Sequence, residues 1–357
     1  MAFDLKTRLR PHILGIKPYS SARDEYAGAE GTFLDANENP FGALTGEPFN
    51  RYPDPYQNAI KEKLAPIKGV RKGQIFLGNG SDEAIDLLMR AFCIPGEDNI
   101  LLLPPTYGMY EVSASINDIA VKRVSLTEEF QLRPKEILDS ADNQTKIIFI
   151  CSPNNPSGNK MRREDILKVL GSFEGLVVID EAYIDFSDEK SFTVELDHFP
   201  NLLVMQTFSK AWGLANLRIG MAFASEEIIR VLNLIKPPYN ISGLTQEKVL
   251  DSLEYAHKIH DIVDSILEER EYLEKELLKL PLVKKVFPSH ANFLLVKVSD
   301  AKAAYDYLVE EKIIVRDRSK VMLCENCLRI TVGTRSENLI LLSALAAFEP
   351  IDKPIAS

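Results

Sequence analysis

The sequence predicts an α/β protein built around a mostly parallel sheet with helices on both faces. Two observations lead to this prediction. Short apolar runs alternate with segments of helical periodicity from residue 74 to about residue 234, which is the pattern of a two-sided parallel sheet. The runs at 147–150 and 176–179 contain no polar residue at all, as expected of strands that are buried on both sides.

The expected elements of the first two thirds of the chain can be placed in order. Residues 1–36 contain Pro11, Gly15 and Pro18 and show little periodicity, so we expect an extended arm. The predicted helices begin near Ser81, at Pro134 and at Glu226. The predicted strands are 74–77, 100–103, 120–124, 147–150, 176–179, 201–206 and 219–224.

Residues 236–242 interrupt this alternation with two prolines and mark the predicted domain boundary. A long helical stretch at 245–279 comes next, charged on one side, which indicates a solvated face. The smaller C-terminal part is then expected to alternate, with strands at 283–287, 291–298, 313–315 and 328–332 and helices at 301–310 and up to Phe348.

The composition limits the classes of protein to which this chain can belong. The 357 residues are 45% hydrophobic and 26% charged, as in ordinary globular proteins, and the length predicts about two domains. The net charge of −10 and the lack of a basic block argue against a nucleic-acid partner. No apolar run approaches the roughly 18 residues of a membrane span, and the N-terminus lacks a signal core, so we expect a cytoplasmic location.

Three candidate functional residues lie where predicted strands end. Asn155, Asp180 and Lys210 come after the strands at 147–150, 176–179 and 201–206. The carboxyl ends of parallel strands form ligand sites in α/β proteins. A lysine amine does covalent chemistry only when it is partly neutral, and burial beside other cations lowers its pKa from about 10.4. A buried carboxylate is costly unless it meets a cation.

Features that suit a phosphate lie close to these residues in the sequence. Ser209 offers a hydroxyl and Arg218 a fork of donors, which together suit a phosphate monoester. The run Gly78-Asn79-Gly80-Ser81-Asp82 joins the first strand to a helix, whose exposed N–H groups and dipole form an anion site. Because Glu83 stands where a dinucleotide fingerprint needs a third glycine, the alternative of an NAD site is weakened.

Cys324 and Cys327 have the spacing of half a zinc site or a redox pair. No second pair of cysteines or histidines accompanies them, so a loop before the strand at 328–332 is the favoured interpretation and no metal is expected.

Together, these motifs resemble the fold-type-I aminotransferases that use pyridoxal phosphate, and within them the histidinol-phosphate group. The resemblance runs from about Leu34 to Thr334. It implies a seven-stranded sheet in a large cofactor-binding domain (37–240), a smaller α+β domain (241–357) and an arm (1–36) that reaches a partner subunit. It also implies a homodimer whose active sites are shared across the interface.

The resemblance assigns a role to each candidate residue. Lys210 would form the Schiff base with the cofactor and carry the proton, Asp180 would keep the pyridine nitrogen protonated, and Asn155 and Tyr183 would bind the ring oxygen. Tyr107 would stack on the ring. The cofactor phosphate would be held by Gly80, Ser81, Asp82, Thr207, Ser209, Arg218 and the partner's Tyr52, and the substrate by Arg316, Arg329, Tyr19 and Asn155. The two arginines are expected to end strands.

The implied reaction is reversible amino transfer between L-histidinol phosphate and 2-oxoglutarate, a step of histidine biosynthesis. Three alternatives remain open. They are an aromatic amino acid aminotransferase, a threonine-phosphate decarboxylase of the same fold, and a non-catalytic regulator with an aminotransferase-like domain. The last class usually adds a basic DNA-binding module, and this chain has neither the extra length nor the charge.

Overall fold

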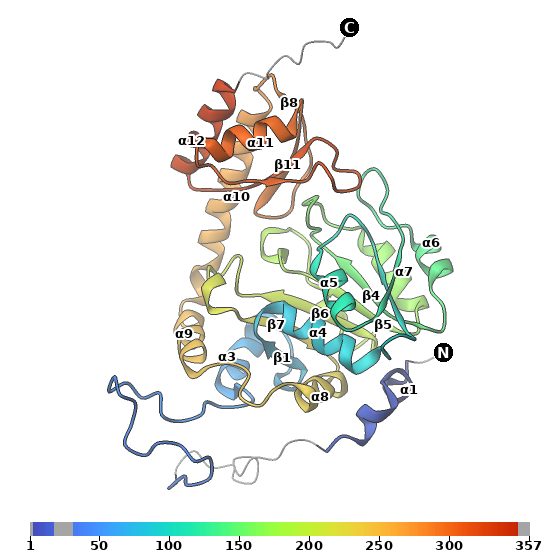
Figure 1. Ribbon diagram of the computed structural model, residues 1–357, viewed down its shortest axis with the longest axis vertical. Coiled ribbons are helices and arrows are strands. Elements are labelled where there is room, and N and C mark those ends of the chain that lie inside the picture. The colour runs from blue at the N-terminus through green and yellow to red at the C-terminus, as the bar shows by residue number, and fades with distance from the viewer. Residues whose placement is uncertain (1–2, 18–30, 349–357) are drawn as a thin grey trace.

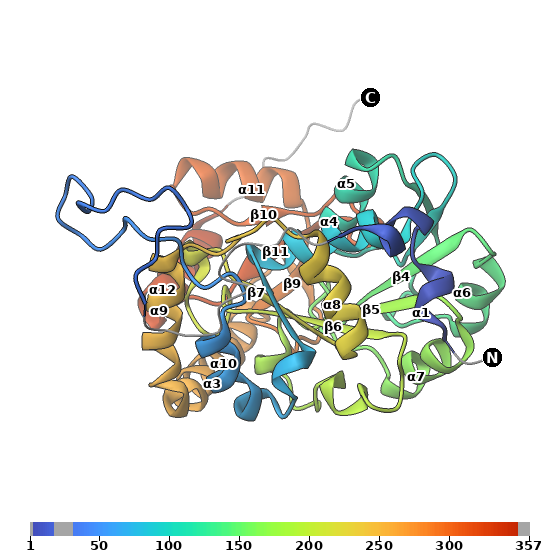
Figure 2. The ribbon, with the colours of Figure 1, turned by 90° about the horizontal axis from the view of Figure 1, so that it is seen from below.

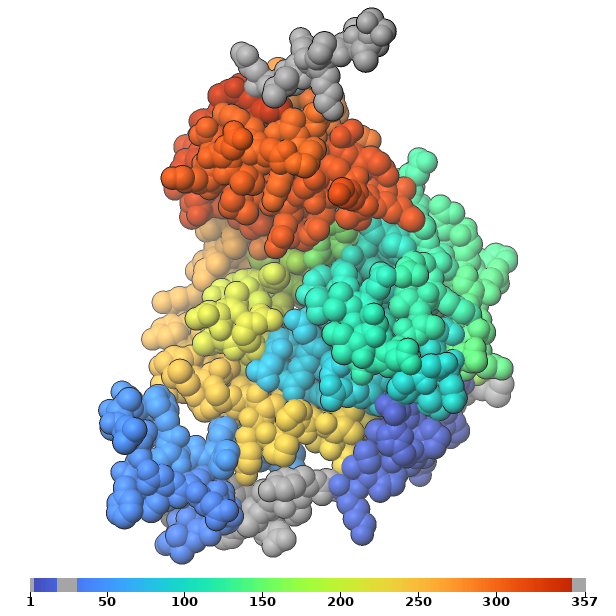
Figure 3. Space-filling model, viewed as in Figure 1, coloured from blue at the N-terminus to red at the C-terminus, as the bar shows by residue number. Residues whose placement is uncertain are grey.

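The computed structural model describes residues 3–17 and 31–348, which form two lobes (Figure 1). The larger lobe is built on a seven-stranded sheet and the smaller, C-terminal lobe on a four-stranded sheet. In the space-filling view the smaller lobe, in orange and red, sits on one end of the larger lobe (Figure 3). No helix within the described ranges has the length and apolarity that a membrane crossing requires.

The large sheet has the strand order β1-β7-β6-β5-β4-β2-β3. Only β7 is antiparallel to its neighbours β6 and β1, and the other pairs are parallel. The expected mostly parallel sheet of seven strands is therefore confirmed. Its strands are β1 (Ile75–Gly78), β2 (Asn99–Leu102), β3 (Ala120–Arg123), β4 (Thr145–Cys151), β5 (Leu176–Asp180), β6 (Leu202–Thr207) and β7 (Gly220–Ala224).

Helices cover both faces of this sheet, which explains why its central strands lack polar residues. In β4, Ile148 and Ile150 pack into one hydrophobic core, while Ile147 and Phe149 pack into the other. The first core includes α3 (Asn58–Lys68), α6 (Pro134–Ser140), α7 (Arg163–Ser172) and α9 (Gly243–Leu253). The second includes α1 (Leu5–Arg8), α4 (Gly80–Phe92), α5 (Met109–Ile116) and α8 (Glu226–Ile235).

The smaller lobe is an antiparallel sheet with helices on one face. Its strands are β8 (Val283–Val286), β9 (Phe293–Val298), β10 (Arg316–Asp317) and β11 (Cys327–Thr331), in the order β10-β11-β9-β8. Leu294 and Leu328 face a core that α10 (Ile259–Leu277), α11 (Ala301–Glu310) and α12 (Arg335–Ala347) complete. The opposite face is turned toward the larger lobe, because Leu295 and Cys327 pack into its core.

Several elements differ from the sequence-based expectations. The helices α3, α5 and α7 were not expected, and the stretch at 245–279 is two helices separated by the 3₁₀ turn η6 (Ala256–Lys258). The stretch divides because α9 packs on α3 in the large core, whereas the far end of α10 belongs to the small core. Residues 313–315 are not a strand. The remaining 3₁₀ turns are η1 (Pro11–Gly15), η2 (Lys72–Gln74), η3 (Ile184–Phe186), η4 (Phe192–Glu195) and η5 (Ala215–Leu217). The domain boundary after residue 240 stays a prediction.

The N-terminal segment is not extended over its first part. Residues 5–15 form α1 and η1, Leu5, Leu9 and Ile13 are buried, and Arg10 N–H donates to the carbonyl of Ala91 in α4. The expectation of an unpacked arm is therefore wrong for these residues, because their leucines close one end of the large core. The irregular segment before α3 projects from the body in both ribbon views (Figures 1 and 2).

Candidate active site

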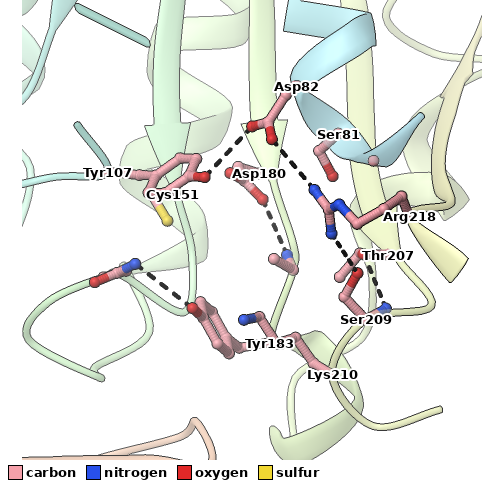
Figure 4. Close-up of a pocket in the computed structure, with 13 residues that line it drawn as sticks. Ser81, Asp82, Tyr107, Cys151, Asp180, Tyr183, Thr207, Ser209, Lys210 and Arg218 are labelled. Atoms are coloured by element: carbon pink, nitrogen blue, oxygen red, sulfur yellow. Dashed lines mark hydrogen bonds and ion pairs between the residues drawn. The ribbon is translucent and has the colours of Figure 1, made fainter. Parts of the chain in front are cut away.

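A pocket lies at the carboxyl ends of β4, β5 and β6, where α/β sheets bind their ligands (Figure 4). Its empty volume, counted together with the open solvent at the pocket mouth, is about 540 Å³. It is lined by Gly80, Ser81, Asp82, Tyr107, Cys151, Asn155, Asp180, Ala182, Tyr183, Thr207, Ser209, Lys210 and Arg218. All of these except Cys151 and Ala182 are candidate site residues from the sequence.

Lys210 lies just after β6 and presents its amine inside this pocket. Its Nζ lies 5.6 Å from the centre of the Tyr183 ring. The side chain is open to solvent at the pocket mouth but has protein on its other sides. This partial burial, together with the positive charges of Arg329 and Arg218, lowers the pKa of Lys210, and Asp180 opposes the shift. The amine is therefore more easily deprotonated than an ordinary lysine.

Asp180 ends β5 and is only 4% exposed. Its Oδ2 accepts a hydrogen bond from the Tyr110 hydroxyl at 2.5 Å, and its Oδ1 accepts one from Ala182 N–H at 3.0 Å. Burial raises the pKa of Asp180 in spite of these donors. Among the described residues no basic side chain forms an ion pair with it. A cation placed in the pocket would compensate this carboxylate.

Tyr110 is a residue that the sequence analysis did not assign. It is completely buried in α5, and its ring stacks on Phe149 of β4 with the centroids 4.7 Å apart. Burial and the charge of Asp180 raise the pKa of Tyr110 well above its usual value, so the hydroxyl keeps the proton that it donates. Tyr107 precedes α5 and Tyr110 is the second residue of this helix, so no helical spacing linked the two tyrosines in the sequence.

The features that are expected to bind a phosphate meet on the other side of the pocket. Arg218 Nη1 lies 3.5 Å from Ser209 Oγ, and Nη2 lies 3.5 Å from Asp82 Oδ2. The first turn of α4 begins beside them, since Gly80 N–H donates to the carbonyl of Arg218 at 2.8 Å. The N–H groups of a first helical turn have no partner within the helix and are free to bind an anion.

Two glycines allow this close approach of the turn, the strand and Arg218. Gly80 has a φ of +70°, and a Cβ there would lie 2.8 Å from Arg218 Nη2. A Cβ on Gly220 of β7 would lie 2.5 Å from the carbonyl carbon of Gly80 and from Ser81 N. A side chain on Gly220 would displace the turn that surrounds the anion site, whereas one on Gly80 would push the Arg218 guanidinium aside and strain the left-handed backbone.

Asp82 and Tyr107 form a second contact across the pocket. The Tyr107 hydroxyl donates to Asp82 Oδ1 at 3.3 Å, and burial with the nearby charge of Asp82 raises the pKa of Tyr107 to about 12. Figure 4 shows Asp82 between Tyr107 and Arg218. Because a carboxylate repels phosphate, this residue suits the site through its backbone N–H and through positioning Arg218 rather than through its side chain.

The two arginines that are expected to bind the substrate come from the smaller lobe. Arg329 Nη1 donates to Asn155 Oδ1 at 2.5 Å, and Asn155 Nδ2 lies 3.5 Å from the Tyr183 hydroxyl. Arg316 is exposed and pairs with Arg329 across β10 and β11. The expectation that both arginines end strands is wrong, because Arg329 is the middle residue of β11 and Arg316 opens the short β10.

Tyr52, one of the two tyrosines expected from a partner subunit, does not line this pocket of its own chain. Tyr52 is 50% exposed, stacks on Tyr239 at a centroid distance of 4.6 Å, and lines a separate depression. Tyr19 lies outside the described residues. Their expected roles therefore stay predictions.

Cys324 lies in the turn that leads into β11, and Cys327 is the first residue of that strand. Both are buried. Within residues 3–17 and 31–348, no group of three or more His, Cys, Asp or Glu side chains is arranged to hold a metal ion.

The residues of the pocket fit the expected cofactor. An uncompensated buried carboxylate suits a protonated ring nitrogen, and the arginine, hydroxyls and helix N-terminus suit a phosphate. The amine of Lys210 lies in the same pocket, so it is available to an aldehyde of that ring. Pyridoxal phosphate carries the ring nitrogen, the aldehyde and the phosphate on one molecule.

Comparison with known proteins gives a consistent result. The family model for aminotransferase class I and II matches residues 25–345. The chain is 56% identical over 348 residues to the histidinol-phosphate aminotransferase of Cytophaga hutchinsonii, which covers 98% of this chain and 100% of that protein.

Two solved structures share the fold. The histidinol-phosphate aminotransferase of Clostridium acetobutylicum superposes with a TM-score of 0.77 at 25% identity, over 84% of this chain and 90% of that one. The histidinol-phosphate aminotransferase of Sinorhizobium meliloti, solved in complex with pyridoxal-5'-phosphate, has a TM-score of 0.77 at 21% identity, over 87% of this chain and 89% of that one.

Proposed function

Since the chain belongs to the class I and II aminotransferase family, we propose that it transfers the amino group of L-histidinol phosphate to 2-oxoglutarate with pyridoxal phosphate as cofactor. The products are imidazole acetol phosphate and L-glutamate, and the reaction is a reversible step of histidine biosynthesis. The identity of 56% over nearly the whole of a relative with this name supports the substrate. The observation that carries the chemistry is the amine of Lys210 in one pocket with Asp180 and the Arg218 anion site.

The bound cofactor supplies an electron sink for the negative charge that develops on the substrate Cα. Asp180, fixed by Tyr110 and Ala182, holds a proton on the ring nitrogen. Asn155 Nδ2 lies 3.5 Å from the Tyr183 hydroxyl, and the two groups would donate hydrogen bonds to the ring oxygen. The phosphate is held by the hydroxyls and N–H groups of Ser81, Thr207, Ser209 and the first turn of α4, together with Arg218.

Lys210 then acts as the general base. Its Nζ would take the proton from the substrate Cα and return it to the cofactor carbon that is bonded to the transferred nitrogen. The lowered pKa of Lys210 supports this role, because a base works best when its pKa is close to the working pH. Such proton transfer contributes roughly 10²–10⁴-fold to the rate of an enzyme.

Arg329 and Arg316 bind the anionic end of the substrate. The same two guanidinium groups must accept a phosphate in one half-reaction and a carboxylate in the other, and bidentate forks suit both anions. Arg329 also orients Asn155, with which it shares a hydrogen bond. This contact links the substrate end of the site to the cofactor end.

The proposal includes a cytoplasmic homodimer. Leu34, Phe41 and Leu44 in the projecting segment are 87%, 96% and 108% exposed, and apolar side chains gathered on a surface mark an interaction site. A partner subunit seated on this segment would cover them and bring its Tyr52 to the other subunit's pocket.

A half-reaction tests the function. Purified enzyme is mixed with L-histidinol phosphate alone, and the visible absorbance of the cofactor should be lost and should return when 2-oxoglutarate is added. L-phenylalanine and threonine phosphate are compared at equal concentrations. A higher kcat/KM with phenylalanine, or release of CO₂ from threonine phosphate, would replace the proposed substrate.

A matched pair of variants tests the assignment of Lys210. Lys210→Ala should lower the rate of the half-reaction by a factor of at least about 10², which is the lower limit for loss of a general base. Lys135→Ala, a surface lysine of α6 that pairs with Asp139, should behave like the wild type. Normal turnover by Lys210→Ala would remove this residue from the mechanism.

A further inference from the structure

Three arginines gather on one face of the small sheet. Arg316 and Arg329 are direct partners across β10 and β11. The N–H of Arg318 donates to the carbonyl of Cys327 at 2.9 Å, which continues the same antiparallel ladder by one step. Because side chains alternate between the faces of a strand, Arg316 and Arg318 point to the same side as Arg329.

This face is turned toward the larger lobe and its pocket. Leu295, which opposes Arg329 on β9, packs into the large core, as does Cys327. Leu328, the neighbour of Arg329 in sequence, packs into the small core on the other side. Arg329 reaches Asn155 in the pocket, so the arginine face borders the substrate end of the proposed active site.

The three charges lack acidic partners. Among the described residues no carboxylate lies within ion-pair distance of any of them. Asp317, which lies between Arg316 and Arg318, alternates to the opposite face and accepts a hydrogen bond from Ser319 N–H at 2.8 Å. Half-buried like charges destabilise one another unless an anion is present.

Arg318 shows the unfavourable environment of these charges most clearly. Its Nε is buried and has no hydrogen-bond partner. Burial and the neighbouring charge of Arg316 lower the pKa of Arg318, and burial and the charge of Arg318 lower the pKa of Arg329. Arg318 therefore lies close enough to Arg329 for the two guanidinium groups to affect each other.

We propose that Arg318 is a third arginine of the substrate-anion site and contacts the phosphate of the substrate directly. A phosphate monoester carries close to two negative charges and three acceptor oxygens, so it can occupy three guanidinium groups. A carboxylate carries one charge and two oxygens and is satisfied by two. Arg318 thus favours a phosphate over a carboxylate at the same position. This inference rests on the proposed function, because the phosphate is that of the amino-alcohol substrate.

Steady-state kinetics of the holoenzyme test the contact. Arg318→Gln should lower kcat/KM for L-histidinol phosphate by about 10- to 100-fold, chiefly through KM, as expected for loss of a hydrogen bond between charged groups. The kcat/KM for L-glutamate should change by less than about threefold, because the carboxylate keeps its two arginines. Arg318→Lys keeps the charge but not the paired N–H donors of the guanidinium, so it should lower kcat/KM for L-histidinol phosphate by less than Arg318→Gln does.

A matched control separates contact with substrate from damage to the lobe. Arg335→Gln makes the same substitution in the same lobe, where Arg335 pairs with Glu269 at 2.9 Å and lies over the ring of Tyr272. It should leave the preference between the two substrates unchanged. An equal loss with both substrates for Arg318→Gln, or no loss with either, would overturn the proposal.

Inorganic phosphate distinguishes a failure of this inference from a failure of the proposed function. A wild-type enzyme that does not use histidinol phosphate would refute the function. Inorganic phosphate is then still tested as a competitive inhibitor against glutamate. Its inhibition constant should be at least about tenfold higher for Arg318→Gln than for the wild type. Equal inhibition constants would overturn the contact whatever the natural substrate is.

Discussion

Tyr110 donates a hydrogen bond to Asp180, the carboxylate that is expected to hold the ring nitrogen of the cofactor, although Tyr110 itself does not line the pocket. Its hydrogen bond stabilises the charged form of Asp180. Both groups are buried, so water does not compete with the Tyr110 hydroxyl for the carboxylate. Without it, Asp180 keeps the N–H of Ala182 as its one remaining donor. The carboxylate would then be less firmly oriented, and its pKa would rise further.

Tyr110→Phe should therefore weaken cofactor binding and lower kcat by about 10- to 100-fold, the effect of one hydrogen bond to a charged group. The dissociation constant of the cofactor is measured by fluorescence titration of the apoenzyme, and kcat by the full reaction. Tyr255→Phe, at a tyrosine that is 60% exposed, is the control. Wild-type values of both quantities would show that Asp180 needs no support from the hydroxyl.

At the scale of residues, the sequence located the side chains at strand ends and missed those that reach the site from neighbouring elements. Lys210, Asp180 and Asn155 could be predicted because each comes at the end of an apolar run or shortly after it, and parallel strands end at one edge. Tyr110 and Asp180 are 70 positions apart, and they meet only because the Tyr110 side chain of α5 reaches across Phe149 of β4 to the end of β5. Arg318 was not singled out, because the two-residue strand before it leaves no periodicity to detect.

The turn between β1 and α4 depends on how closely it packs against β7. Gly220→Ala would place a methyl group within 2.5 Å of Gly80 and Ser81. Overpacking of this kind costs about 1–3 kcal/mol. Because the displaced turn is the expected phosphate site, we expect a lower Tm and a higher cofactor dissociation constant.

Gly171→Ala in α7 is the matched control, because a methyl group there meets no atom within 4 Å. Alanine is the better helix former by up to about 1 kcal/mol, so this variant should be as stable as the wild type or more stable. Both quantities are measured by thermal unfolding and cofactor titration. A Gly220→Ala enzyme that binds the cofactor normally would separate the turn from phosphate binding.

Glu181 comes directly after β5 and gives the apoprotein a pH-dependent stability. It is buried and accepts hydrogen bonds from Ser191, Phe192 N–H and Gln206. Burial raises the pKa of Glu181 from its usual 4.5 to about 7. Between these values the folded state holds a proton that the unfolded state has released, so this group lowers the free energy of unfolding as pH rises. The loss is on the order of 3 kcal/mol over the window.

Glu181→Gln should remove this dependence. The free energy of unfolding of the wild type, relative to the variant, should fall as pH rises from about 4.5 to about 7 and then level off. Urea unfolding of the apoprotein at several pH values measures it, with the exposed Glu310→Gln as control. A constant difference across the window would show that Glu181 is ionised throughout.

At the scale of elements, the apolar runs predicted every strand of the large sheet to within about two residues, because burial on both faces leaves a strong signal. The missed helices had weaker signals. α3 contains Pro66, and α5 has only eight residues. The break between α9 and α10 is set by the two cores on which they pack, which no local pattern records.

A single chain does not make the contact that is expected between Tyr52 and the cofactor site. Tyr52 is expected at the cofactor phosphate, yet it does not line the pocket of its own chain and lines a separate depression instead. In a symmetric dimer each subunit would lend its Tyr52 to the other. Lys210 and Tyr52 of one active site then belong to different chains.

Mixing two inactive variants tests this arrangement. Lys210→Ala and Tyr52→Ala homodimers each lack one group in both sites. In a mixed dimer, one site combines Lys210 of the second variant with Tyr52 of the first and is intact. Random exchange makes about half of the dimers mixed, so activity should recover to about a quarter of the wild-type value. The assay follows subunit exchange at low protein concentration, with dimer formation checked by sedimentation.

In the control experiment, Lys210→Ala is mixed with Ser209→Ala instead of with Tyr52→Ala. Because Ser209 and Lys210 line the same pocket of one chain, each mixed dimer then has one site without the amine and one without the hydroxyl, and its activity should not exceed that of Ser209→Ala alone. Recovery with Tyr52→Ala but not with Ser209→Ala can arise only if the tyrosine crosses between subunits. Mixed dimers that form and show no recovery would place Tyr52 in the active site of its own chain or outside both sites.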